Sequence, residues 1–233
     1  MGIVNRDEWV TRLSPVDVPA STMHSTDNAD PATTAPTPSE EHRTEADDSL
    51  SIAYIRHRRI DEMLDVIRYC LEGLSVGFDR WNEEHVKGPG FYIAIVSGTS
   101  VEAYADPMGT NAWPTEICRH VTEDINAFYG AASRVAFEAD GAVIASIDGV
   151  IQRPMVRLKD PSRADLEART DEPISYADWM GSRHMSALDT SVREDVVATV
   201  TLSEETGRVT VFSDGRFETV EREAIGGRWR VQS

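Results

Sequence analysis

The feature that most constrains the fold is an uninterrupted apolar run, Phe91-Tyr-Ile-Ala-Ile-Val96, which follows directly after Gly88-Pro-Gly90. Six residues are far too few to span a bilayer, and the β-branched, glycine-bounded run predicts a strand. Because the run has no polar face, the strand should be covered on both sides, as in sheets that carry helices on each face. The sequence therefore indicates an α/β fold.

Helical patterns lie on both sides of this run. Apolar residues recur at spacings of three and four from Ile60 to Leu74, which predicts a helix that ends near Gly77. A second helix is predicted from Pro114 to Gly130, since proline is tolerated in the first turn. Short β-branched segments predict further strands at residues 135–137, 142–147, 196–202 and 209–212. We expect a mixed β-sheet flanked by helices.

Composition divides the chain at about residue 50. Residues 1–49 are rich in Ser, Thr, Pro and Ala and hold ten acidic residues against three arginines. Such a segment buries too little apolar area to offset its ordering entropy, so we predict a disordered acidic tail. Residues 50–87 are predicted to form an N-terminal helical segment, and residues 88–233 one α/β domain.

The charge balance limits the function classes. The net charge is −17, and the 23 basic residues comprise 21 arginines and two lysines, Lys87 and Lys159. This acidity excludes a general nucleic-acid scaffold, which would carry a basic face. Acidity with so little lysine favours a protein that works in high salt, where charges are screened, and an ordinary acidic bacterial protein is the alternative.

Several familiar sites are excluded. Cys70 and Cys118 are far apart and are expected to be buried, reduced thiols. No apolar leader is seen, so we expect a cytoplasmic protein without membrane contact. Neither lysine is followed by Ser or Thr, which closes the P-loop option, and the six histidines never occur at metal-ligand spacing.

Three short segments remain as candidates for chemistry. They are Asp140-Gly141-Ala142 before a strand, Gly181-Ser182-Arg183-His184 at a helix start, and Ser203-Glu204-Glu205-Thr206-Gly207 between two strands. Taken singly, each is also explained as a turn, a solvated helix start or an acidic loop. Together and in this order they resemble the diadenylate cyclase family, which makes cyclic di-AMP from two ATP molecules. That family carries Asp-Gly-Ala, Gly-Thr-Arg-His-Arg and Ser-Glu-Glu-Thr-Gly motifs.

The resemblance covers about residues 88–220 and is nearest to the stand-alone soluble archaeal type, with the composition pointing to a haloarchaeal one. Ser182 stands where the family has Thr and keeps the hydroxyl. Met185 replaces the second Arg of Arg-His-Arg, which removes one potential phosphate contact. Ala139 stands where bacterial members often have His, and the stretch at about 152–180 is longer than the bacterial pattern.

The resemblance implies specific roles. Asp140 and Glu204 would hold Mg²⁺ or Mn²⁺, and Asp140 is also the candidate proton acceptor. The residues expected to take part in catalysis are Asp140, Gly141, Ala142, Arg183 and His184. The residues expected to bind ATP and its phosphates are Gly141, Ser182, Arg183, His184, Ser203 and Glu204. Each protomer would hold one ATP, so the active form would be a head-to-head homodimer or a higher homo-oligomer.

Two other interpretations stay open. The chain is alternatively a nucleotide-binding regulatory module with a silent catalytic site, for which Met185 is the support. A third interpretation is an unrelated α/β interaction domain whose motifs arose by chance. Formation of product from ATP and divalent metal would distinguish a cyclase from a silent nucleotide-binding module. Nucleotide bound to the purified protein would count against an unrelated interaction domain.

Overall fold

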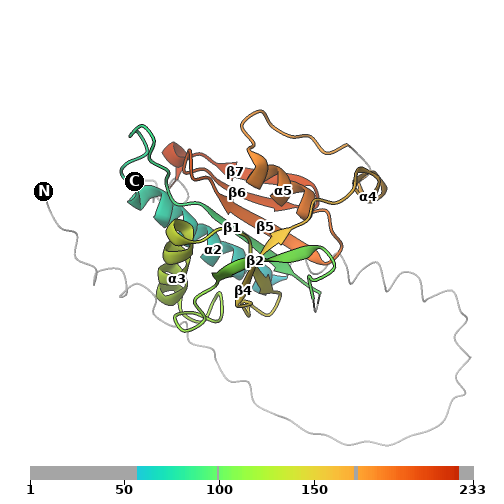
Figure 1. Cartoon of the computed structure of the whole chain (residues 1–233), viewed down its shortest axis with the longest axis horizontal. Coiled ribbons are helices and arrows are strands. Elements are labelled where there is room, and N and C mark those ends of the chain that lie inside the picture. Colours follow the sequence, from blue (N-terminus) through green and yellow to red (C-terminus); the bar gives the residue numbers. More distant parts are fainter. Residues whose placement is uncertain (1–56, 99, 171–172, 226–233) are drawn as a thin grey trace, which may run out of the picture. The chain divides into compact units, whose positions relative to one another are not determined.

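The computed structural model describes residues 57–98, 100–170 and 173–225, so the predicted tail at 1–49 lies outside the described residues (Figure 1). In chain order the elements are α2 (Arg58–Gly77), β1 (Phe91–Val96), β2 (Ala105–Ala112), α3 (Ile125–Glu138), β3 (Val143–Ser146), β4 (Pro154–Leu158), α4 (Arg163–Arg169), α5 (Ser182–Thr190), β5 (Val196–Leu202), β6 (Val209–Ser213), β7 (Arg216–Val220) and the 3₁₀ helix η3 (Arg222–Ala224). None of the helices in these ranges is both long and apolar enough to cross a lipid bilayer.

The main sheet has five strands in the order β3-β1-β5-β6-β7. Strand β1 pairs in parallel with β3, and the other neighbours pair antiparallel. Strands β2 and β4 form a separate antiparallel pair, and an isolated bridge from Ala142 to Val156 joins β4 to the start of β3. The predicted mixed α/β sheet flanked by helices is confirmed.

Strand β1 is buried along its whole length and separates two apolar cores. Phe91, Ile93 and Ile95 pack into the core that contains residues of α2 and α3. Tyr92, Ala94 and Val96 point the other way, into the core that contains residues of α5 and β4. The alternation follows from the period of two along a strand. The predicted strand with two covered faces is therefore confirmed.

Helix α2 is also confirmed, with its buried stripe on the side facing the sheet. It begins after His57, whose Nδ1 accepts a hydrogen bond from the backbone N–H of Arg59 at 3.3 Å. The buried apolar residues of this stripe are Ile60, Met63, Ile67, Cys70, Leu71 and Leu74. Both cysteines are buried and unbridged, as predicted, and burial raises the pKa of the Cys70 thiol to about 12.

The predicted second helix from Pro114 to Gly130 is wrong in both bounds. Turns and an isolated bridge occupy residues 115–123, and α3 begins after Asp124, whose carboxylate accepts from the N–H groups of Asn126 and Ala127. The helix continues through Gly130, where a side chain would point into open space, so this glycine does not end it. The strand predicted at 135–137 is consequently the last part of α3.

Candidate functional site

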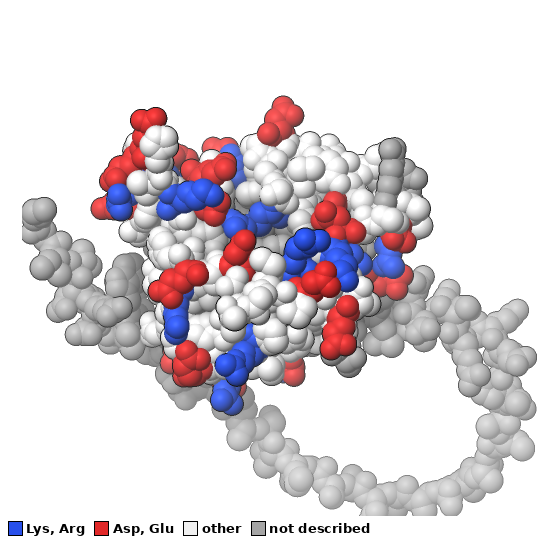
Figure 2. Space-filling view, viewed as in Figure 1, with Lys and Arg blue, Asp and Glu red and all other residues white. Residues whose placement is uncertain are grey.

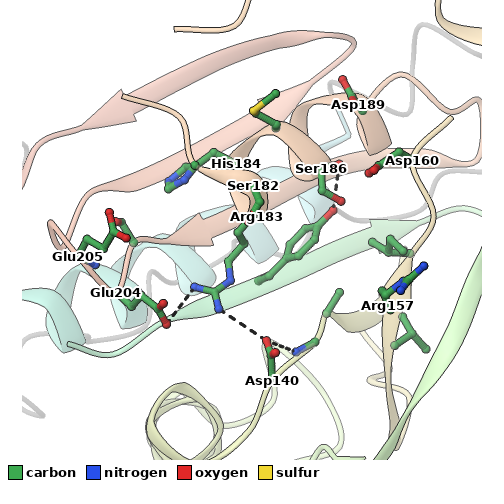
Figure 3. A pocket seen from close by; sticks show the side chains of 18 of the residues that line it. Asp140, Arg157, Asp160, Ser182, Arg183, His184, Ser186, Asp189, Glu204 and Glu205 are labelled. Carbon is green, nitrogen blue, oxygen red and sulfur yellow. Dashed lines mark hydrogen bonds and ion pairs between the residues drawn. The ribbon is translucent and has the colours of Figure 1, made fainter. Parts of the chain in front are cut away.

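All eight residues predicted from the three motifs line one cavity of about 690 Å³. They come from the loop between α3 and β3, from the start of α5, and from the loop that follows β5 (Figure 3). The eight residues are Asp140, Gly141, Ala142, Ser182, Arg183, His184, Ser203 and Glu204. Long-range pairing of β1 with β3 and β5 therefore brings together motifs that are far apart in sequence.

The Asp140 loop is shaped by its own hydrogen bonds and by Gly141. The Asp140 carboxylate accepts from the Gly141 N–H at 2.8 Å, and the Asp140 carbonyl accepts from the Asn111 amide at 2.9 Å. Gly141 has φ +107°, and a Cβ there would lie 2.9 Å from Met108 Cγ and 3.1 Å from the Val156 carbonyl oxygen. Only glycine fits this conformation and space without strain. The loop thus presents the Asp140 side chain, which is 71% exposed, at the cavity.

Arg183 lies between two carboxylates. Its Nη2 is 3.7 Å from Asp140 Oδ1, and its Nη1 is 3.6 Å from Glu204 Oε2 (Figure 3). The other oxygen of Glu204, Oε1, is 2.8 Å from Lys87 Nζ. Lys87 and Arg183 together hold the pKa of Glu204 below its usual range, with the Lys87 hydrogen bond as the larger cause. We call the three lining residues Asp140, Arg183 and Glu204, together with Lys87 beside them, the Arg183 end of the cavity.

His184, the next residue on α5, is in a different environment. Its side chain is buried, with the residue 6% exposed, and its ring meets Trp179 edge to face at 5.2 Å. Burial, followed by the charges of Arg183 and Arg208, lowers the pKa of His184 to about 4. Its Nε2 has no hydrogen-bond partner among the described residues. At neutral pH this imidazole is uncharged, and it can donate a hydrogen bond to a ligand or accept one from it.

The two serines differ in how they are used. Ser182 is the first residue of α5, and no side chain caps this helix at Gly181. The backbone N–H groups of a helix start favour anions, and this start lines the cavity. The Ser203 hydroxyl, in contrast, accepts from the N–H groups of Glu205 and Thr206, both at 3.3 Å. Ser203 therefore shapes the loop that carries Glu204.

Sequence reasoning missed a second group of cavity residues. Asp160 and Asp189 line the cavity, and the Tyr176 hydroxyl donates to Asp189 at 2.6 Å. We call these three residues the Asp189 end. Figure 3 shows Glu204 on one side of the cavity and Asp160 and Asp189 on the other. Burial raises the pKa of Asp189, and the charge of Asp160 adds to this effect. Lys87 was also missed as a site residue, although the rarity of lysine was a signal.

The two predicted metal ligands, Asp140 and Glu204, both pair with Arg183. Arg183 lies between their carboxylates, and no three His, Cys, Asp or Glu side chains gather as a metal site within the described ranges. Both oxygens of Glu204 are taken up by cations. Asp140 is mostly open to solvent, and one carboxylate plus substrate oxygens is a donor set that Mg²⁺ accepts. Of the two, Asp140 fits a metal.

Charges on the surface are mixed. Figure 2 shows Lys and Arg side chains beside Asp and Glu side chains on the visible face, without a continuous basic stripe on that face. This arrangement places cations in local pairs, such as Arg134 with Glu116 at 3.2 Å and Lys159 with Asp106 at 3.0 Å. The positive charge of the Arg183 end is likewise balanced by neighbouring carboxylates.

Comparison with known proteins gives fold-level likenesses only. No protein-family model matches the chain, and no curated protein matches it. A Bacillus cereus structure described as a hypothetical membrane spanning protein has 20% identity and a TM-score of 0.44, over 67% of this chain and 62% of that one. A double mutant of DacA from Staphylococcus aureus has 19% identity and a TM-score of 0.39, over 73% of this chain and 97% of that one. Neither likeness assigns a family or an activity at these values.

Proposed function

We propose that this chain is a diadenylate cyclase, a nucleotidyltransferase that condenses two ATP molecules into cyclic di-AMP and releases two pyrophosphates. The observation that carries the proposal is the convergence of three motifs, chosen from sequence alone, on one cavity. Chance turns and acidic loops have no reason to meet in this way. The cavity also has the components that phosphoryl-type transfer requires, namely a carboxylate, an arginine and an uncapped helix start.

The chemistry is two equivalent displacements. In each, the 3′-oxygen of one ATP forms a bond to the α-phosphorus of the other, and the bond from that phosphorus to the bridging oxygen breaks. Pyrophosphate leaves with the electron pair, and the 3′-hydroxyl proton passes to a base. We assign this base to Asp140, the exposed carboxylate of the cavity, and we assign the offset of the phosphate charge to Arg183 and the N–H groups of α5.

We assign Mg²⁺ or Mn²⁺ to Asp140, together with phosphate oxygens of the substrate. When bound, such an ion neutralises phosphate charge and lowers the pKa of a coordinated hydroxyl. Glu204 is the second ligand implied by the family motif, and its ion pairs to Lys87 and Arg183 give it a supporting role here. Asp140 itself binds, orients and accepts a proton.

The reaction requires two facing sites, because each ATP supplies both a nucleophile and an electrophile. We therefore propose a head-to-head homodimer, in which each protomer holds one ATP. The exposed Asp140 side chain is consistent with a site that a second protomer closes. Specific activity should fall when the protein is diluted below the dimer dissociation constant, as measured alongside the oligomeric state by light scattering.

The deciding experiment is incubation of the full chain with ATP and Mn²⁺ or Mg²⁺ in molar KCl, with mass spectrometry of the product. Cyclic di-AMP is the expected product. The second candidate, a silent nucleotide-binding module, is favoured by Met185, which lines the cavity where the family has Arg. ATP bound without any product would favour that candidate, and the absence of binding would contradict both.

A further inference from the structure

Lys87 lies outside the three motifs and is not among the residues that line the cavity, yet it touches the site. Its Nζ is 2.8 Å from Glu204 Oε1, across 117 residues of sequence. Arginine accounts for 21 of the 23 basic residues of the chain, so a lysine at this point departs from the composition of the chain. The exception needs a physical reason.

Lys87 ends a row of alternating charges. It binds Glu204, which faces Arg183 at 3.6 Å, which in turn faces Asp140 at 3.7 Å. The four residues come from four separate parts of the chain. The Arg183 guanidinium is therefore attracted by two carboxylates, Asp140 and Glu204. The attraction by Glu204 depends on Lys87, which binds the same carboxylate.

The difference between lysine and arginine explains the choice. An ammonium is a compact point charge, and here it contacts one oxygen of Glu204, Oε1, while Oε2 faces Arg183. A guanidinium at position 87 would present a planar fork that binds both oxygens of a carboxylate. Such a fork would compete with Arg183 for Oε2. A lysine keeps the second oxygen available.

The backbone next to Lys87 fits the same pair closely. A Cβ at Gly90 would lie 2.8 Å from Arg183 Nη1 and 3.1 Å from Glu204 Oε2. The Gly88 N–H donates to the Glu204 carbonyl at 2.8 Å. The loop that carries Lys87 is thus held against the Arg183–Glu204 pair by contacts independent of the Lys87 side chain.

We propose that Lys87 is a positioning residue of the cavity: by binding one oxygen of Glu204, it leaves the other for Arg183 and so holds the guanidinium beside Asp140. This inference rests on the proposed function, in which Arg183 contacts substrate phosphates. The Lys87 side chain is 75% exposed, and exposed ion pairs contribute little to stability. Its effect should therefore appear in turnover and not in folding.

A double-mutant cycle tests the proposal in the full chain. Lys87→Met should lower kcat about tenfold with a melting temperature close to that of the wild type. In a Glu204→Gln background the same change should have no further effect, because Lys87 acts through Glu204. Additive losses would mean that Lys87 contacts the nucleotide directly and would overturn the proposal.

Lys87→Arg is the sharpest variant. It keeps the charge but introduces the fork, so it should also lose activity, whereas wild-type activity would show that any cation suffices and would refute the one-oxygen argument. Arg80→Met is the matched control: it removes one basic charge from the same loop and breaks an exposed pair with Glu83 at 2.7 Å. Its activity should equal that of the wild type.

A spectroscopic readout separates this inference from the proposed function. The Nε–Hε resonance of Arg183, assigned by its loss in Arg183→Lys, should shift in Lys87→Met and Lys87→Arg and not in Arg80→Met. A wild-type protein that makes no product from ATP would refute the proposed function, while this resonance would still decide the role of Lys87. An unchanged resonance in both Lys87 variants would overturn the inference even in an active enzyme.

Discussion

The Arg183 end and the Asp189 end of the cavity both contain carboxylates, but in opposite electrostatic settings. At the Arg183 end, Glu204 lies against two cations, and its pKa is lowered. At the Asp189 end, Asp189 is buried beside a tyrosine hydroxyl and near another acid, and its pKa is raised. A carboxyl group is therefore held ionised at one end and pushed toward its neutral form at the other.

Under the proposed function, the contrast indicates what each end would bind. Fixed opposite charges and an uncapped helix start suit phosphate oxygens and a metal ion, which are charged throughout the reaction. A buried carboxyl that already shares a hydrogen bond suits contact with uncharged polar groups of a ligand. His184 shows that the boundary is local, since it follows Arg183 in sequence but is buried against the Trp179 ring, where burial keeps the imidazole neutral at pH 7.

The largest expected effect is at the Arg183 end. Asp140→Asn keeps the shape of the side chain but removes the charge and the proton acceptor, so cyclic product should fall about a thousandfold. ATP binding, measured by calorimetry, should change little. Glu116→Gln, a carboxylate-to-amide change at an exposed pair with Arg134, is the control and should leave turnover intact. Near-normal turnover in Asp140→Asn would remove Asp140 from the mechanism.

The second prediction concerns His184 and pH. Its folded pKa of about 4 lies below the ordinary value of 6.5, so the stability it contributes is complete above pH 6.5 and is lost as pH falls toward 4. His184→Phe keeps an aromatic ring and removes the titration. The difference in unfolding free energy between wild type and variant should change by about 3 kcal/mol between pH 7 and pH 4, as measured in urea. Parallel pH profiles would show a solvated histidine.

The sequence predicted the elements whose signals are local and strong. The stripe from Ile60 to Leu74 and the run from Phe91 to Val96 became α2 and β1 because their apolar patterns match what they bury. Both bounds of α3 were missed: Pro114 predicts a start, but the N-cap is Asp124, and Gly130 predicts an end, but the helix continues to Glu138.

The site was predictable only where residues form motifs. The eight motif residues meet in the cavity, but nothing local links Lys87 to Glu204 or Tyr176 to Asp189. Those contacts depend on strand pairing and loop paths, which single-sequence patterns do not specify. The lowered pKa of Glu204 follows from its contact with Lys87, whereas the raised pKa of Asp189 follows from burial, and neither could be predicted from sequence patterns.

A third prediction tests the backbone of the Arg183 end. Gly141→Ala places a Cβ at φ +107° and 3.1 Å from the Val156 carbonyl oxygen, which should cost about 2 kcal/mol of stability. Gly130→Ala is the matched control, since it lies within α3 where a side chain meets open space, and it should stabilise by about 0.5–1 kcal/mol. Denaturant unfolding of both variants measures the difference. Equal effects would mean that Gly141 is not conformationally required.

The smallest expected effect is on melting temperature, where carboxyl-to-amide substitutions at the two ends should give shifts of opposite sign. Because the pKa of Asp189 is raised, ionising it costs the folded state, and this cost grows as pH rises above the ordinary value of 3.8. Asp189→Asn can still accept from Tyr176, so it should melt a few degrees higher than wild type at pH 7, with no difference below about pH 3.8.

The pKa of Glu204 is lowered, so the stabilisation by its carboxylate is present above pH 4.5 and is lost as pH falls. Glu204→Gln should therefore melt slightly lower than wild type at pH 7 and converge with it in acid. Melting curves of the two variants at pH 7 and pH 3 decide the matter, and shifts of the same sign at both ends would contradict the electrostatic contrast between them.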